Sequence, residues 1–258
     1  MSSLVARAPL GAAKSLAARA LCHPLVGTLV GRWYKDRIPD RRGCTIRTPP
    51  PVAPAVKAML FWKMYESAEV RFVDRYLRAD LDVLEVGASI GVVGSHIARR
   101  LGENHKLVCV EANPTLMAIL EENVRSNAPR ARLSFRNAAI AYAGTAEVEL
   151  TFGETNLGGA LGKKGDDRVR VKAATLSDVI HEEAIGDFCW VSDIEGAESG
   201  VILEDRSALE RCKQIIIELH NTDVKGRRVT FGEMASWLVD KGFQTTARYG
   251  PIYVFDRA

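Results

Sequence analysis

The sequence lacks a cysteine pattern that would hold a metal ion or build a disulfide framework. Five cysteines occur among 258 residues, an odd number at wide spacings, and no C-x-x-C pair is present. The pattern argues against a zinc site and a disulfide-stabilised secreted domain, and it favours a reducing compartment. Cys109 and Cys189 fall inside apolar stretches, where cysteine is mostly a small core residue.

The sequence also lacks an apolar run long enough to cross a bilayer. The longest uncharged run, Ala20 to Gly31, has 12 residues and contains Pro24, whereas about 20 are needed. The net charge of +3 is too small to indicate nucleic-acid binding, so no nucleic-acid partner is expected.

Acidic residues are missing from residues 1–35, which carry five positive charges. Within this part, Ser3 to Leu21 is rich in alanine and leucine and predicts an amphipathic helix. Three interpretations are open: a surface helix of the fold, a helix on an anionic membrane surface, or a transit peptide. We therefore expect a cytoplasmic protein, with peripheral membrane contact through residues 1–35 as an alternative.

A polar and then proline-rich stretch separates this extension from the rest of the chain. Residues 36–54 contain five prolines, and consecutive prolines favour extended backbone. We expect a basic helical extension and connection over residues 1–54 and a main domain over residues 55–258. Ala55 to Leu77 then predicts a single helix.

The main domain opens with a strand that runs into a glycine turn and a helix. Asp82 to Val86 predicts the strand, and Gly87 and Gly91 lie in the turn. This arrangement builds the nucleotide crevice of open α/β sheets, where glycine lets the backbone approach a ligand. Ser89 stands where a dinucleotide fingerprint needs its middle glycine. The spacing from Glu85 to Gly91 therefore favours S-adenosylmethionine (SAM) over a nicotinamide cofactor.

Strands alternate with helices along the rest of the chain. Strands are predicted at 106–111, 132–136, 147–151, 168–171, 188–192 and 214–219, helices at 113–127, 175–180 and 230–241, and a hairpin at 243–247 and 252–255. The pattern predicts an α/β fold: a doubly wound, mostly parallel, seven-stranded Rossmann-like sheet with an antiparallel C-terminal hairpin and an N-terminal helical extension. The glycine-rich residues 152–167 predict a loop near the site.

Polar positions at two strand ends extend the predicted cofactor site. Glu111 ends the second strand, 24 positions after Gly87, and an acid there accepts hydrogen bonds from the ribose hydroxyls. Asn137 and Ala138 follow the third strand, where the adenine edge would rest.

Acids and one histidine follow the next two core strands. Asp193 ends the fourth strand, beside the point where the strand order is expected to reverse and ligands bind. Glu195 and Glu198 are three residues apart and are expected to share a helix face near its N-terminus. Glu218 and His220 end the fifth strand, and histidine titrates near working pH.

These side chains suit the removal of a proton from an alcohol. Methyl transfer from a sulfonium to an alcohol oxygen is helped by a positioned base or by a metal-bound alkoxide. The candidate catalytic residues are therefore Asp193, Glu218 and His220. A hard divalent cation such as magnesium, held by Asp193 with Glu218 or His220, is the alternative.

Over residues 65–255 the sequence resembles the FkbM family of SAM-dependent methyltransferases. The matching motifs are Tyr65-Glu66, Glu85-Val-Gly-Ala-Ser-Ile-Gly91, Glu111-Ala-Asn-Pro114, Asn137-Ala-Ala139, Thr175-Leu176, Asp193-Ile-Glu-Gly-Ala-Glu198 and Ile217-Glu-Leu-His220. The resemblance implies O-methylation of a hydroxyl on a sugar, glycan or natural product. It implies a cofactor-binding set of Tyr65, Glu66, Glu85, Gly87, Ala88, Ser89, Gly91, Glu111, Ala112, Asn113, Asn137 and Ala138, with Glu195 and Glu198 on the acceptor side.

Three positions depart from the family pattern. Ser89 stands where asparagine is usual, Ser177 replaces a common aspartate, and Val191 stands where lysine is normal. Two other functions stay open. A nicotinamide-dependent oxidoreductase is disfavoured by Ser89, and a non-catalytic binding protein with a methyltransferase fold is disfavoured by the retained acids.

Overall fold

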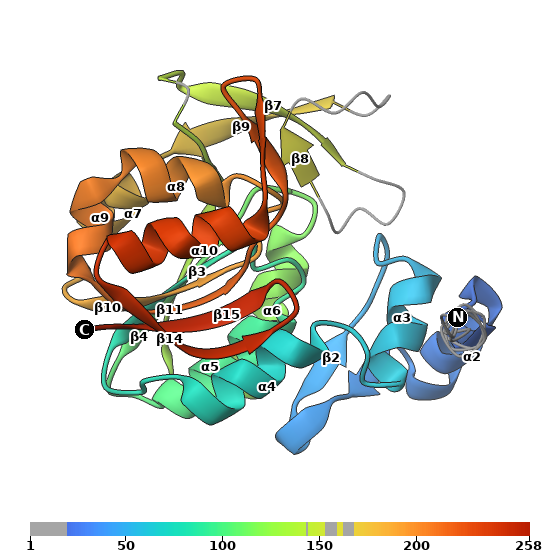
Figure 1. Cartoon of the computed structure of the whole chain (residues 1–258). Coiled ribbons are helices and arrows are strands. Elements are labelled where there is room, and N and C mark those ends of the chain that lie inside the picture. The colour runs from blue at the N-terminus through green and yellow to red at the C-terminus, as the bar shows by residue number, and fades with distance from the viewer. Residues whose placement is uncertain (1–19, 143, 153–158, 162–167) are drawn as a thin grey trace, which may run out of the picture. The chain divides into compact units, whose positions relative to one another are not determined.

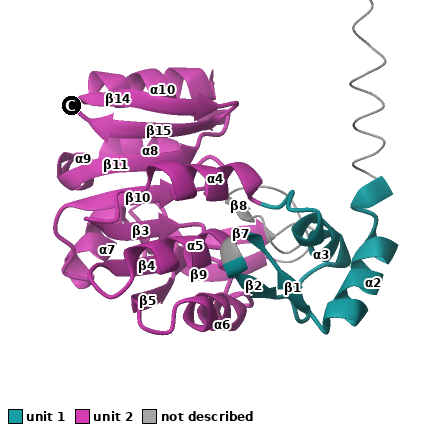
Figure 2. Ribbon diagram, turned by 90° about the horizontal axis from the view of Figure 1, so that it is seen from below, with its two compact units in different colours: residues 1–65 teal, residues 66–258 magenta. Residues whose placement is uncertain are grey.

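The protein forms two compact units in a computed structural model that describes residues 20–142, 144–152, 159–161 and 168–258. The units comprise residues 1–65 and 66–258 (Figure 2). This division lies later than the predicted boundary between residues 54 and 55. Most of the predicted helix from Ser3 to Leu21 lies outside the described residues.

The first unit is built on two helices whose backbones touch. Helix α2 (Pro24–Tyr34) packs on α3 (Pro54–Phe61). At Gly27 an added Cβ would lie 1.6 Å from the carbonyl oxygen of Pro54, so only glycine permits this approach. The predicted polar connection contains more structure than expected: an antiparallel hairpin of β1 (Arg37–Pro39) and β2 (Thr45–Arg47) around a 3-10 turn, η1 (Arg41–Gly43).

The predicted single helix from Ala55 to Leu77 is wrong. Helix α3 ends at Phe61, and α4 (Ser67–Tyr76) begins in the second unit. Between them Lys63 and Glu66 have left-handed backbone, with φ of 57° and 47°. The break contains neither glycine nor proline, so the apolar periodicity did not mark it.

The second unit is organised by a seven-stranded sheet in the order β14-β15-β11-β10-β3-β4-β5. Its strands are β3 (Asp82–Val86), β4 (Lys106–Glu111), β5 (Arg132–Asn137), β10 (Phe188–Ser192), β11 (Cys212–Glu218), β14 (Phe243–Tyr249) and β15 (Ile252–Arg257). The first five are parallel, and β15 runs antiparallel to both of its neighbours. This confirms the predicted doubly wound sheet with its C-terminal hairpin.

Helices cover both faces of this sheet (Figure 1). One face carries α4, α5 (Val92–Leu101) and α6 (Met117–Asn127). The other carries α7 (Leu176–Glu182), α8 (Glu198–Glu204), α9 (Arg206–Arg211) and α10 (Phe231–Asp240), over a core that includes Trp190 and Phe255. A capping box of Thr230 and Glu233 opens α10. Both faces are buried, so the core strands read as continuous apolar runs.

A smaller sheet, in the order β6-β9-β7-β8, follows the third core strand. It comprises β6 (Ala139–Ile140), β7 (Glu147–Phe152), β8 (Gly159–Leu161) and β9 (Arg168–Ala174). Most of the loop predicted over residues 152–167 lies outside the described residues. A hairpin of β12 (Thr222–Val224) and β13 (Arg227–Val229), not predicted, follows His220. Within the described part of the chain, no helix combines the length and apolarity needed to span a membrane.

Candidate active site

The site lies where the strand order of the sheet reverses, between β3 and β10. The chain steps from β3 to β4 and β5 in one direction and to β10 and β11 in the other. The two strand ends are joined by backbone, because the N–H of Asp193 donates to the carbonyl of Val86 over 3.1 Å. Ligands of open α/β sheets bind outside the carboxyl ends at such a point.

The turn after β3 has no room for side chains at its first glycine. Gly87 has φ of +82°, and an added Cβ would lie 1.9 Å from the carbonyl oxygen of Asp193. Its N–H donates to the carbonyl of Val110 on β4. The glycine therefore lets three strand ends meet at one point.

Glu111 fixes the shape of this turn from the neighbouring strand. Its carboxylate is buried and accepts the N–H of Ser89 over 2.8 Å and the N–H of Asn113 over 2.7 Å. Burial raises the pKa of Glu111, and these two N–H groups oppose the rise. The bond to Ser89 supports a left-handed backbone, with φ of +49°, that asparagine adopts more readily than serine. The Ala112 N–H is a third donor to this carboxylate, which has about four acceptor positions and so keeps one for a ligand hydroxyl.

Asn137 and Ala138 hold the adjoining strand end. The Asn137 amide donates to the carbonyls of Glu111 and Ala112 over 2.9 and 3.1 Å. The Ala138 N–H donates to the Glu111 carbonyl. The predicted adenosine positions are thus brought together around Glu111, at the ends of β4 and β5.

Glu85 is buried beneath the turn, against the start of α5. Its Oε2 accepts from the Cys109 thiol over 3.1 Å, and the carboxylate also bonds the backbone of Gly94 in the first turn of α5. Burial raises the pKa of Glu85 to about 8. Through its hydrogen bond to Gly94, this carboxyl ties β3 to α5.

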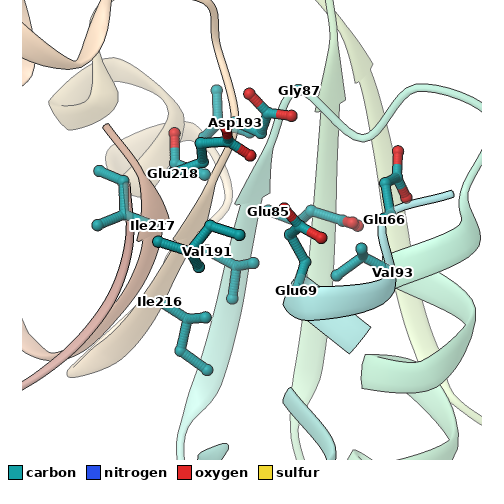
Figure 3. A pocket seen from close by; sticks show the side chains of 13 residues that line it. Glu66, Glu69, Glu85, Gly87, Val93, Val191, Asp193, Ile216, Ile217 and Glu218 are labelled. Carbon is teal, nitrogen blue, oxygen red and sulfur yellow. The ribbon is translucent and has the colours of Figure 1, made fainter. Parts of the chain in front are cut away.

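A cavity of about 400 Å³, including the part open to solvent, lies beside these strand ends. Figure 3 shows Asp193 and Glu218 on the strand side, with Glu66 and Glu69 on the α4 side. Val191 forms part of its apolar wall, at the position where the FkbM pattern has lysine. Among the described residues that line it are five carboxylates and no basic side chain. Such a lining favours a ligand that carries positive charge.

His220 stands at the centre of a second group of carboxylates. Its Nδ1 lies 3.0 Å from Oε1 of Glu198, which has no exposed surface and also accepts the N–H of Ile194. Its Nε2 faces three further acids: Asp193 at 3.7 Å, Glu218 at 3.8 Å and Glu195 at 4.0 Å. Nδ1 is therefore fixed by Glu198, and Nε2 is directed toward the acids at the strand ends.

The carboxylates and the histidine shift one another's proton affinity. Burial raises the pKa of Asp193 to about 7 although the His220 charge opposes it. Burial also raises the pKa of Glu218 to about 8, helped by a hydrogen bond with the Glu69 carboxyl. Burial lowers the proton affinity of His220, but the hydrogen bond and charge of Glu198 outweigh it and raise its pKa to about 9. At neutral pH His220 is thus protonated and Asp193 is poised to gain or lose a proton.

The structure corrects two expectations about the acids after β10. Glu195 and Glu198 do not share a helix face, because α8 begins only at Glu198. Glu195 and Gly196 have φ of 54° and 104°, which no helix contains. Glu198 is buried behind His220 and is not among the residues that line the cavity.

Sequence reasoning missed Glu69. Glu69 lines the cavity one helical turn after Glu66, a spacing that puts both on one side of a helix start. Tyr65 is the last residue of the first unit. Ser177 donates to Asp205 and so joins α7 to α9.

Comparison with known proteins places the chain in a family. The profile described as the methyltransferase FkbM domain matches residues 85–245, more than half of the chain. The chain belongs to the FkbM methyltransferase family. No curated protein matches the chain.

Solved structures resemble this FkbM methyltransferase at low sequence identity. A protein of the NADB-Rossmann superfamily from Streptococcus agalactiae is 12% identical, with a TM-score of 0.45 and 74% of this chain and 68% of that one covered. Precorrin-6y C5,15-methyltransferase from Geobacter metallireducens is 14% identical, with a TM-score of 0.41 and with 74% of this chain and 86% of that one covered. Aeropyrum pernix fibrillarin, crystallised with SAM, is 14% identical, with a TM-score of 0.41 and with 73% of this chain and 72% of that one covered.

The chain is a SAM-dependent methyltransferase, and its residues fit that cofactor. The carboxylate of Glu111 retains an acceptor position for the ribose, and the acidic cavity suits the charges of a sulfonium and an ammonium group. The turn at Gly87 keeps the strand ends close enough for one ligand to span both. Family membership removes the nicotinamide-dependent oxidoreductase from consideration.

Proposed function

We propose that this FkbM methyltransferase transfers the methyl group of SAM to a hydroxyl of a sugar, glycan or natural product. The observation that carries the proposal is the arrangement of Asp193 and Glu218 around His220 at the mouth of the switch point. An alcohol is a poor nucleophile until its proton leaves, and groups with pKa values near working pH remove protons best.

Among the three candidates from the sequence, Asp193, Glu218 and His220, this proposal makes Asp193 the base. A carboxylate with a pKa of about 7 is ionised in part at neutral pH, whereas His220, with a pKa of about 9, already carries its proton. The imidazolium lies 3.7 Å from Oδ1 of Asp193 and favours the ionised form of that carboxylate. The Asp193 side chain is 38% exposed and lines the cavity, so an acceptor hydroxyl can reach its carboxylate.

The cofactor supplies the methyl group as an electrophilic sulfonium. The residues of the chain would then perform four tasks. Glu111 and the turn at Gly87 would hold the adenosyl part, and Glu66 and Glu69 would face the charged groups of SAM from the cavity wall. Asp193 would take the hydroxyl proton, and Glu195 would face the acceptor.

A divalent cation is a second candidate at the same place. Oxygens of Asp193 and Glu195 and a nitrogen of His220 lie within 4.8 Å of one another, which allows one ion to contact all three. Carboxylate oxygens suit a hard cation such as magnesium, and Glu198 would orient the histidine ligand as carboxylates do in metal sites. A bound cation would lower the proton affinity of an acceptor alcohol.

The experiment is a screen of extracts for a product that gains one methyl group only when SAM and enzyme are both present. We expect a neutral or cationic hydroxyl compound, methylated on oxygen, because the cavity walls are acidic. Methylation on nitrogen or carbon would overturn the proposal. Chelator treatment followed by magnesium titration decides between base and metal, since the base proposal predicts unchanged turnover. If wild-type protein binds SAM but methylates nothing in any extract, the non-catalytic alternative gains support.

A further inference from the structure

The first unit presents an apolar stripe on the outside of α2. Leu25, Leu29 and Trp33 are 69%, 66% and 83% exposed and follow one another at intervals of four residues. Residues four apart on a helix lie on the same side. Exposed side chains of this size are normally scattered singly, so a run of three along one side of a helix needs an explanation.

The other side of α2 accounts for its place in the fold. Gly27, Val30 and Gly31 are buried where α2 packs on α3. The stripe therefore faces away from the core of its own unit. Leu21, Trp62 and Met64 add exposed apolar surface to the same unit, and the Trp62 indole donates to the carbonyl of Leu21 over 3.0 Å.

Charge is distributed very unevenly between the two units. Residues 1–65 contain 11 lysines and arginines but 2 acids, a formal charge of +9. Since the chain as a whole carries +3, residues 66–258 carry −6. Both acids of the first unit have a lysine near them: Asp36 lies 2.6 Å from Lys57 and Asp40 lies 3.8 Å from Lys63.

We infer that the first unit docks on an anionic phospholipid surface through the stripe Leu25, Leu29 and Trp33. Leucine and tryptophan enter the interface between headgroups and acyl chains, where tryptophan is favoured. Arg32 and Lys35 are exposed beside the stripe, and each basic residue near an anionic leaflet adds to the attraction. The same positive charge opposes a second copy of the unit as occupant, because two surfaces of +9 repel each other.

This inference is independent of the proposed function, since none of its residues belongs to the cavity or to the His220 cluster. It predicts a peripheral association, in which the stripe lies in the surface and α2 does not cross it. The association should be weak and sensitive to salt, because a single short amphipathic face with a basic flank binds reversibly.

The test is co-sedimentation of the full chain with vesicles of phosphatidylcholine alone or with about 30% phosphatidylglycerol. We expect binding to the anionic vesicles, reduced at least about tenfold between roughly 0.1 and 0.5 M salt. The triple variant Leu25→Gln, Leu29→Gln, Trp33→Gln should lose about tenfold or more. The matched control, Leu203→Gln with Val239→Gln, removes two exposed apolar side chains from the second unit and should bind as wild type. Unchanged thermal unfolding and SAM binding show that each variant is folded.

A second readout follows Trp33 directly. Vesicle binding should shift the tryptophan emission to shorter wavelength, and Trp33→Phe should remove most of that shift while the protein still binds. Four results would each overturn the inference: no binding to anionic vesicles, equal binding by the triple variant, equal binding to phosphatidylcholine alone, or a stripe-dependent dimer. Binding to duplex DNA without binding to vesicles would also overturn it.

Discussion

The two halves of the central sheet use carboxylates in opposite ways. On the β3–β4–β5 side, Glu85 and Glu111 accept hydrogen bonds from the backbone and from a thiol. On the β10–β11 side, Asp193 and Glu218 surround a histidine, and Oδ1 of Asp193 is buried without a hydrogen-bond partner among the described residues. Carboxylates whose hydrogen bonds are made fix the local geometry. A buried carboxylate oxygen without a hydrogen-bond partner destabilises the fold, and a proton or a ligand that bonds to it removes that cost. The first half is therefore suited to holding a cofactor and the second to chemistry.

The largest effect is expected from a substitution where the two halves of the sheet meet, and it is a loss of stability. Gly87→Ala places a Cβ 1.9 Å from the Asp193 carbonyl oxygen at a φ of +82°. Neither backbone segment can move without disturbing a core strand, so we expect a loss of about 3 kcal/mol or more of unfolding free energy. Chemical denaturation measures it. Gly186→Ala, where an added Cβ meets nothing within 4 Å, is the control and should unfold as wild type. Equal stability of the two variants would contradict the account.

The next effect belongs to the chemical half. Asp193→Asn keeps the shape of the side chain but removes its ability to take a proton, so kcat should fall by about a hundredfold or more. SAM affinity should stay within about threefold, because the change lies on the acceptor side. Turnover with the acceptor from the extract screen measures the first and calorimetry the second. The control is Asp187→Asn, whose side chain is exposed at the other end of β10, and its kcat should be normal. Full activity of Asp193→Asn would show that Asp193 is not the base.

A smaller effect should follow from the cofactor half. Glu111→Ala removes the acceptor for the Ser89 and Asn113 N–H groups and the predicted partner of the ribose. We expect SAM to bind about ten- to a hundredfold more weakly, with kcat at saturating SAM changed much less. Titration calorimetry gives the affinity. Glu103→Ala, which removes a surface carboxylate paired with Arg130 over 3.6 Å, should bind SAM normally. If Glu111→Ala lowered kcat without weakening SAM binding, the assignment of Glu111 to cofactor binding would be wrong.

The finest distinction comes from pH. The pKa of Asp193 is raised to about 7, so kcat/KM should rise with pH as that acid loses its proton near pH 7. The pKa of His220 is raised to about 9, so activity should fall again as the imidazolium is lost near pH 9. The two limbs are properties of the cluster as a whole.

Glu198→Gln tests the alkaline limb separately. It removes the charge that raises the pKa of His220, so that limb should move to lower pH. The acid limb should move less, because the Glu198 charge is only a minor cause of the raised pKa of Asp193. A pH profile of Glu198→Gln that matches wild type would show that Glu198 does not position or charge His220. A histidine whose pKa is raised on folding stabilises the fold below its unfolded pKa and loses that contribution as pH rises through 9. The free energy of unfolding of the wild type should therefore decline as pH rises from about 6.5 to about 9.

The fold was predictable because its signals are local. The strand before Gly87 and the strand ending at Ser192 are continuous apolar runs bounded by turn residues, and both occur with the predicted bounds. Asp193 and His220 could be assigned to one edge of the sheet because parallel strands end together. The separation of the helices at Lys63 and Glu66 could not be predicted, since left-handed backbone at lysine and glutamate follows from tertiary packing.

The interior of the site was less predictable for the same reason. Whether Glu198 faces an acceptor or a histidine depends on the turn at Glu195 and Gly196, whose dihedral angles leave no pattern in the sequence. Which of the three candidates, Asp193, Glu218 and His220, takes the proton depends on the number of carboxylates around one imidazole. That number is a property of the folded chain. Glu69 was detectable in principle, by its spacing of three from Glu66 at a helix start.

The most direct test of the contrast between the two halves is titration calorimetry with SAM on wild-type protein, Asp193→Asn and Glu111→Ala under the same conditions. We expect the wild type and Asp193→Asn to bind with affinities within about threefold of each other and Glu111→Ala to bind at least about tenfold more weakly. No heat with wild-type protein, or an equal loss of affinity in Asp193→Asn and Glu111→Ala, would contradict it.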